Sequence, residues 1–198
     1  MASFDQRLLT ALDAAEAVFA GKGYDGASMR DIAGAAGMSI AGLYYYLPSK
    51  QHALELVCER AFGALFDSLD RAVAGAAAPD AKLRAFMRGH LRFVVAHPGA
   101  FRVLLYDMDA LEGQARSAIQ ERRRRYFARA TELVMSVARS QPSPVSSRVA
   151  TGALFGMMNW TPMWQHGGDA AEAAAIADQM CELYLRGITP PQATEVVA

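Results

Sequence analysis

The residues with the clearest capacity for chemistry lie between positions 28 and 50 of this 198-residue sequence. They share hydroxyl or ammonium groups that can bind phosphate, and they are Ser28, Ser39, Tyr44, Tyr45, Tyr46 and Lys50. A phenol can also meet a sugar or a base edge, and the capped N-terminus of a helix attracts anions. The pattern therefore indicates a surface that contacts nucleic acid.

Two short helices must position these groups. Ser28 can cap the first helix, and Asp31 three residues later can reach back to it as in a capping box. Gly37 suits the left-handed turn that ends this helix. Ser39 can cap the second helix, which Pro48 prevents from continuing. Two short helices around a turn with glycine predict a helix-turn-helix.

The second helix has one predicted inner side. Leu43 and Leu47 are four residues apart and therefore face inward together. The positions left to face outward are Ile40, Ala41, Tyr44 and Tyr45. Consecutive phenols would need buried partners in a core, so an exposed face toward DNA is favoured. The alternative is an αα-hairpin whose tyrosines cover a partner surface.

A set of residues over roughly the first 55 positions resembles, without a gap, the N-terminal domain of TetR-type transcriptional repressors. The set is Ala17, Phe19, Gly23, Tyr24, Ser28, Ile32, Ala33, Ala36, Gly37, Ser39, Leu43, Tyr44, Lys50 and Leu54. The resemblance implies an all-helical homodimer. Each chain would have a three-helix DNA-binding head and a larger body for ligand binding and dimerisation.

The resemblance also implies roles for single residues. The positions matching phosphate contacts are Ser28, Tyr44, Tyr46 and Lys50. The positions matching base contacts are Ser39, Ile40, Ala41, Tyr44 and Tyr45. Tyr46 and Leu47 replace a common histidine and phenylalanine, which leaves the fold intact. Ile40 and Ala41 replace polar base-reading residues, which leaves the operator sequence open.

The charge of the chain gives no general attraction to DNA. Twenty Lys and Arg balance twenty Asp and Glu, and residues 1–60 hold five basic against seven acidic residues. A basic face must therefore be local. We expect few ionic contacts per head, with dimerisation supplying much of the affinity.

The rest of the sequence predicts further helices and no strand, so the fold class is all-α. With 53% hydrophobic residues the chain can bury a sizeable core. The expected helices outside the helix-turn-helix are 5–20, 51–78, 81–96, a short one bearing Phe101 to Met108, 112–140, 145–166 and 169–187, with a loose tail from Pro190. The expected domains are a DNA-binding head, 1–50, and a ligand-binding and dimerisation bundle, 51–198. Small residues in the last two helices allow close helix approach, although alanine is also a good helix former, and the two-fold interface between copies is what the family resemblance implies.

An apolar stripe in the body is a candidate effector site. Phe155, Met158, Asn159 and Met163 fall at helical spacing, with Pro162 in the same stripe. Residues from other helices that could complete an apolar cavity with a few polar groups are Met87, His90, Leu105 and Tyr126. The alternative is an ordinary core with methionine as filler. Residues 155–161 and Trp164 also resemble the penultimate helix of TetR-type regulators of fatty-acid and steroid catabolism, which implies an acyl-CoA effector.

Four consecutive arginines at positions 122–125 follow Glu121. One interpretation is a solvated face with ion pairs. The other is that Arg122 and Arg123 hold an anionic head group such as the phosphates of CoA.

Other classes of function find little support. The sequence has no glycine-rich phosphate loop, nucleophile elbow or metal-ligand cluster, so no enzyme, metal or cofactor is expected. Cys58 and Cys181 are expected as packed residues within helices. The uncharged segment 149–168 is too interrupted for a membrane span and predicts a buried helix. A cytoplasmic regulator that binds operator DNA as a dimer and is released by a small apolar effector is the favoured function. A helical carrier of lipids or small molecules is the alternative.

Overall fold

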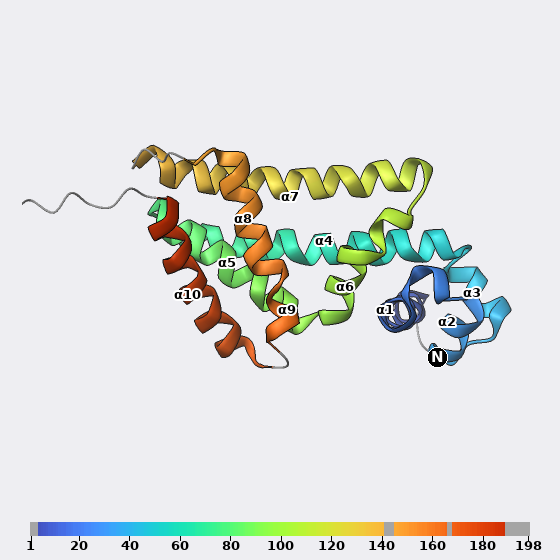
Figure 1. Ribbon diagram of the computed structural model, residues 1–198. Coiled ribbons are helices and arrows are strands. Elements are labelled where there is room, and N and C mark those ends of the chain that lie inside the picture. Colours follow the sequence, from blue (N-terminus) through green and yellow to red (C-terminus); the bar gives the residue numbers. More distant parts are fainter. Residues whose placement is uncertain (1–3, 141–144, 166–167, 189–198) are drawn as a thin grey trace, which may run out of the picture. The chain divides into compact units, whose positions relative to one another are not determined.

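Helices form nearly all of the chain that the computed structural model describes, which is residues 4–140, 145–165 and 168–188 (Figure 1). No strand occurs in these residues, so the predicted all-α class is confirmed. The first three helices are α1 (Phe4–Gly26), α2 (Met29–Ala35) and α3 (Ile40–Tyr46). The predicted boundaries of the helix-turn-helix are confirmed, because the caps that set them are local in sequence.

The remaining helices follow the predicted order. They are α4 (Lys50–Ala74), α5 (Pro79–Ala96), α6 (Pro98–Tyr106), the 3-10 turn η1 (Met108–Ala110), α7 (Gly113–Ser140), α8 (Ser147–Asn159), α9 (Thr161–Trp164) and α10 (Ala170–Ile188). The α4 helix ends before Gly75 rather than at residue 78. The predicted tail from Pro190 lies outside the described residues.

The predicted single helix 145–166 is wrong, because the structure breaks it at Trp160 into α8 and α9. Proline has no backbone N–H, so Pro162 cannot donate to the carbonyl of Met158, and its ring also crowds that carbonyl. The buried character predicted for 149–168 is also wrong for a single chain. Only one side of α8 is buried, while Val149 and Trp160 are 61% and 63% exposed. The predicted His166 end lies outside the described residues.

The chain packs as two compact units that differ from the predicted division at residue 50. The first unit comprises residues 1–64 and 97–124, and the second comprises 65–96 and 125–198. The predicted domains, 1–50 and 51–198, therefore stay a prediction about function. The difference arises because α6 packs against α1. This contact joins segments far apart in the chain, and no local sequence pattern predicts it.

The first unit is held together around Tyr24. The carboxylate of Asp107, after α6, accepts a hydrogen bond from the Tyr24 N–H at 3.0 Å. The Tyr24 ring packs on Phe19 with a centroid distance of 5.7 Å. Gly23 immediately before it has a φ of 71°, a left-handed conformation that favours glycine. These contacts fix the C-terminal end of α1, which kinks at Gly23 and runs to Gly26 rather than ending at the predicted residue 20, against the end of α6.

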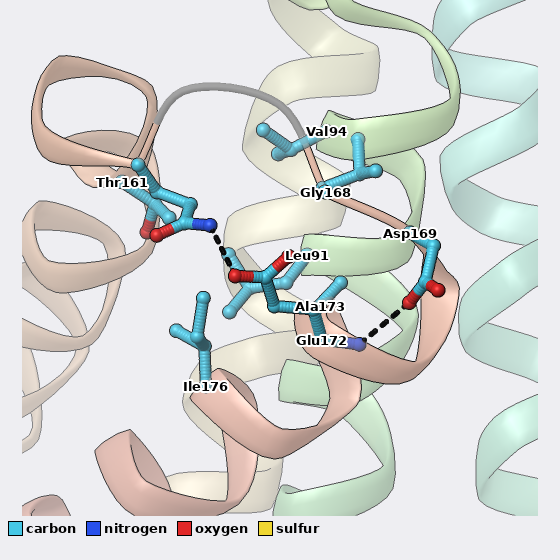
Figure 2. A pocket seen from close by; sticks show the side chains of 10 residues that line it. Leu91, Val94, Thr161, Gly168, Asp169, Glu172, Ala173 and Ile176 are labelled. Atoms are coloured by element: carbon cyan, nitrogen blue, oxygen red, sulfur yellow. Dashed lines mark hydrogen bonds between the residues drawn. The ribbon is translucent and has the colours of Figure 1, made fainter.

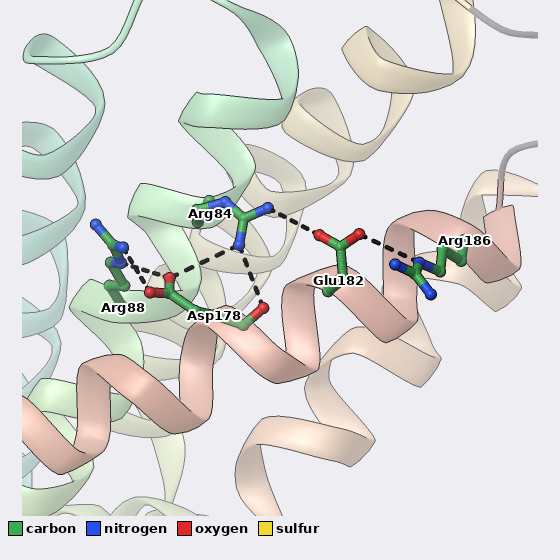
Figure 3. A network of polar contacts seen from close by, with 5 residues as sticks. All are labelled: Arg84, Arg88, Asp178, Glu182 and Arg186. Atoms are coloured by element: carbon green, nitrogen blue, oxygen red, sulfur yellow. Dashed lines mark hydrogen bonds and ion pairs between the residues drawn. The ribbon is translucent and has the colours of Figure 1, made fainter.

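In the second unit, α10 packs along α5 and against α8. An ion-pair network crosses from α5 to α10 (Figure 3). Arg88 makes two hydrogen bonds of 2.6 Å to the carboxylate of Asp178, and Arg84 reaches Glu182 at 3.3 Å. Cys58 on α4 and Cys181 on α10 are buried free thiols, as predicted for packed residues. No helix among the described residues is long and apolar enough to cross a membrane.

Candidate DNA-binding face and candidate effector site

The helix-turn-helix is fixed by two capped N-termini. The Asp31 N–H donates to the Ser28 hydroxyl at 3.2 Å, while the Asp31 carboxylate accepts from the Ser28 N–H at 2.9 Å. The Ser39 hydroxyl accepts from the Gly42 N–H at 3.1 Å. Gly37, with a φ of 62°, makes the turn between the helices. The capping box and the turn glycine predicted from the sequence are confirmed.

The structure gives α3 the predicted inner and outer sides. Leu43 and Leu47 are fully buried. The outward residues Ile40, Tyr44 and Tyr45 are 40%, 47% and 72% exposed. The other predicted contact residues that are exposed are Ser28, Ser39 and Ala41. These side chains form an outward face of α3 and of the caps, while their contact with DNA stays a prediction.

Lys50 is less available than the sequence suggests. Its ammonium donates to the carbonyl oxygens of Tyr24 at 2.9 Å and of Ala27 at 3.0 Å. It also lies 4.2 Å from the centroid of the Tyr24 ring, in a cation–π geometry. An ammonium has three N–H donors, so one remains for a phosphate. Lys50 thus stabilises the turn between α1 and α2 in addition to any DNA contact.

Arg30 is a candidate that sequence reasoning missed. It is exposed on the first turn of α2, beside the Ser28 cap. Two other basic residues of the first unit are engaged in ion pairs: Lys22 pairs with Asp31, and Arg60 pairs with Asp13 and Glu16. The structure gives Arg30 no such ion pair within the described residues. Its signal in the sequence is its position two residues after a helix cap.

A chain of polar groups, buried at His90 and Tyr126 and half-buried at Asn159, occupies the candidate effector site in the second unit. His90 on α5 lies 3.1 Å from the Tyr126 hydroxyl through Nδ1 and 3.1 Å from the Asn159 oxygen through Nε2. With the amide oxygen facing the ring, the proton is on Nε2 and Tyr126 donates to Nδ1. Burial lowers the pKa of His90 to about 4, against a smaller raising effect of the Asn159 hydrogen bond. Burial likewise raises the pKa of Tyr126. All three groups are therefore uncharged at neutral pH.

Aromatic rings enclose this chain. Phe155 lies 5.9 Å from the His90 ring and stacks on Phe127 at 5.3 Å. Phe86 and Phe66 lie 5.6 Å and 5.5 Å from the Tyr126 ring. The structure thus brings together four predicted effector residues, His90, Tyr126, Phe155 and Asn159.

The other predicted effector residues are not shown in contact with this group. Met87 and Met158 are fully buried on α5 and α8. Met163 on α9 is 48% exposed, and Leu105 on α6 is 38% exposed and belongs to the first unit. Their roles stay predictions.

A small pocket lies elsewhere in the second unit, between α5, α9 and α10 (Figure 2). Leu91, Val94 and Ile176 give it an apolar wall, and Gln165 donates to Glu172 at its rim with a 2.6 Å hydrogen bond. Its volume of about 10 Å³ is the room that one water molecule needs. No predicted effector residue lines it, and an effector at His90 would have to separate the rings that now pack there.

Each arginine of the run 122–125 has a partner. Arg122 pairs with Glu59 at 2.9 Å, Arg123 lies 3.9 Å from Asp109, and Arg124 pairs with Glu121 at 2.7 Å. Arg125 lies over the Phe66 ring at 5.9 Å. These contacts favour the solvated face with ion pairs. The described residues contain no cluster of metal-ligating side chains.

An all-helical chain with a capped helix-turn-helix and an outward tyrosine face has the architecture typical of DNA-binding transcription regulators. Residues 11–57 match the family model of bacterial regulatory proteins of the tetR family, and residues 76–188 match the tetracyclin repressor-like C-terminal domain. The chain therefore belongs to the tetR family.

Solved structures agree with this assignment. PfmR from Thermus thermophilus, a TetR-family transcriptional regulator, is 26% identical with a TM-score of 0.81, covering 96% of this chain and 100% of its own. A TetR-family regulator from Bordetella parapertussis is 25% identical with a TM-score of 0.85, covering 93% and 96%. AibR in complex with isovaleryl coenzyme A and operator DNA is 26% identical with a TM-score of 0.78, covering 89% and 97%. Among curated proteins, none matches the chain.

Proposed function

We propose that this tetR-family protein is a repressor that binds operator DNA as a homodimer and is released by an apolar effector. The observation that carries the proposal is the outward face of α3, where Tyr44 and Tyr45 are held by fully buried Leu43 and Leu47. A dimer would present two such helices to successive major grooves, one turn of DNA apart. As a binding protein acting on DNA it would work in the cytoplasm and would catalyse no reaction.

The DNA-binding face is tested with Tyr44→Ala and Arg30→Ala in gel shifts against an operator found by footprinting. Tyr44→Ala should weaken binding by about tenfold if its hydroxyl meets a phosphate or base. Arg30→Ala should weaken binding to all sequences and reduce the salt slope by about one. Arg116→Ala, which removes an exposed arginine from α7, is the matched control.

Unchanged operator affinity in both Tyr44→Ala and Arg30→Ala would contradict the proposed DNA-binding role of this face. If the protein protects no discrete DNA site in footprinting, the alternative function, a helical carrier of lipids or small molecules, would be favoured instead.

The effector is proposed to be a fatty-acyl or steroid-derived CoA thioester. The likeness to AibR, solved with isovaleryl coenzyme A, supports this class. His90, Tyr126 and Asn159 supply hydrogen bonds but no positive charge. They therefore favour the neutral carbonyl of a thioester over a free carboxylate, which is costly to desolvate without a cation. Phe155 and its neighbouring rings would hold the apolar part.

The effector class is tested by titrating operator release with matched pairs of free acid and CoA ester. The ester should release DNA at a lower concentration than the acid. Asn159→Leu should raise the concentration of ester needed by about tenfold, because the hydrogen bonds of the Asn159 amide are lost. Arg122→Ala combined with Arg123→Ala tests whether these arginines meet the CoA phosphates. Equal potency of acids and esters would contradict the thioester and favour a sensor of plain apolar compounds.

A further inference from the structure

Three aromatic side chains form a cluster at the exposed end of the helix-turn-helix. Phe4, at the start of α1, lies 5.0 Å from the Tyr46 ring and 5.9 Å from the Tyr45 ring, measured between centroids. The Tyr45 and Tyr46 rings are 5.1 Å apart and nearly perpendicular. Phe4 contacts Tyr45 edge to face, with an interplanar angle of 82°. Each ring therefore touches the other two.

Two rings of this cluster are largely exposed. Phe4 is 52% exposed and Tyr45 is 72% exposed. Tyr45 is two residues after the fully buried Leu43 and lies on the other side of α3, whereas Tyr46 is three residues after Leu43 and is half-buried. Phe4 thus adds little to the core, and its ring contacts include one exposed and one half-buried tyrosine.

Contacts of this geometry restrict the tyrosine side chains before any DNA arrives. An exposed tyrosine without neighbours samples several χ1 rotamers, and binding must then select one of them. A side chain already held in its bound rotamer loses less freedom on binding, which raises affinity. Edge-to-face and tilted rings at 5 to 6 Å are attractive arrangements.

We propose that Phe4 is a positioning residue for operator recognition, holding Tyr45 and Tyr46 in the orientation in which α3 meets DNA. The inference rests on the proposed DNA-binding function. Phe4 acts through the tyrosines, so its effect on DNA binding disappears when they are absent. A residue that only stabilised α1 would act independently of them.

The test is a double-mutant cycle on operator affinity, with a duplex that the wild-type protein selects from a random-sequence library. Phe4→Ala should weaken binding by about 3- to 10-fold, the loss expected for one or two aromatic pairs. In a background of Tyr45→Ala and Tyr46→Ala, the same substitution should cause no further loss. Leu9→Ala, which removes another exposed apolar side chain from α1, should leave affinity unchanged.

Two variants separate positioning from folding. Phe4→Leu keeps an apolar side chain. Its thermal unfolding midpoint should therefore equal that of Leu9→Ala, while its affinity for the selected duplex falls. Phe4→Tyr keeps the ring and should restore wild-type affinity.

The inference is wrong if Phe4→Leu binds as the wild type does, or if Phe4→Ala weakens both backgrounds equally. If the wild-type protein selects no duplex, the proposed function fails and the inference fails with it. If it selects a duplex that Phe4→Ala binds equally well, only the inference fails.

Discussion

His90 shows how burial decides the chemistry of one residue. Its pKa is lowered to about 4 by burial, and its ring nitrogens contact Tyr126 and Asn159. Sequence spacing places a histidine on an apolar face of a helix. It does not reveal whether partners on two other helices satisfy both nitrogens.

The neutral state of His90 predicts a pH dependence of stability. The folded pKa is below the unfolded value, so the unfolded chain binds the proton more readily, and stability is lost as the pH falls from about 6.5 toward 4. The free energy of unfolding should drop by about 2 kcal/mol between pH 7 and pH 5 from this residue alone.

Denaturant unfolding of the wild type and of His90→Gln at both pH values measures this difference. Glutamine keeps hydrogen-bonding groups without titrating, so His90→Gln should lose less stability. An equal loss in both proteins would mean that other groups cause the pH dependence.

The contacts of Lys50 were only partly predictable from the sequence. Position and type predict a phosphate contact. The hydrogen bonds to Tyr24 and Ala27 depend on carbonyl groups that the folded turn brings to it from more than twenty residues away. The exposure of Tyr44 and Tyr45, by contrast, follows from helical spacing alone.

Among the helices, those with local signals were predictable. The capping box at Ser28 and the cap at Ser39 set the helix-turn-helix, because every group involved lies within three residues of its partner. The break at Trp160 was missed, since a proline in an apolar run permits either a kink or a stop. The contacts between α5 and α10 link residues 90 positions apart in sequence. No local pattern carries that information.

The network between α5 and α10 predicts a modest effect on stability. The hydrogen bonds from Arg88 lower the pKa of Asp178. The stabilisation is therefore present above the unfolded pKa of the carboxyl and is lost as the pH falls through its folded pKa. The groups are partly exposed and screened by water, so Asp178→Asn should cost only about 1 kcal/mol at pH 7.

Thermal unfolding at low and high salt measures the loss for Asp178→Asn. High salt should shrink it. The control is Glu132→Gln, which removes a pair with Arg129 within α7 alone and should cost less. A loss that does not change with salt would argue against an electrostatic cause.

The apolar patterns, in agreement with the resemblance to the tetR family, predicted the all-helical architecture, while the packing units were not predictable. Residues 97–124 pack with the first helices rather than with the rest of the body. Their apolar patterns indicate helices but not the partner that each helix covers.

The exposed side of α8 and α10 predicts dimerisation in solution. Val149 on α8 and Leu183 on α10 are 61% and 69% exposed. The small residues of these two helices allow the helices of two copies to approach closely. We expect a dimer at micromolar concentration in sedimentation velocity, and a monomer for Leu183→Glu. Leu9→Glu, on α1, is the control and should remain dimeric. A wild-type monomer under these conditions would contradict the proposed assembly.

Tyr24 limits how such regulators can be recombined. Its N–H is bound by Asp107 and its carbonyl oxygen by Lys50. The second carboxylate oxygen of Asp107 is buried without a hydrogen-bond partner among the described residues. A hybrid made by joining another head after position 50 would keep Asp107 but lose the glycine turn that brings this N–H to it, unless the new head also has a positive φ there. Transplanting residues 97–124 together with the head would keep donor and acceptor paired. A hybrid meant to change DNA specificity should therefore exchange the whole first packing unit and not only the helix-turn-helix.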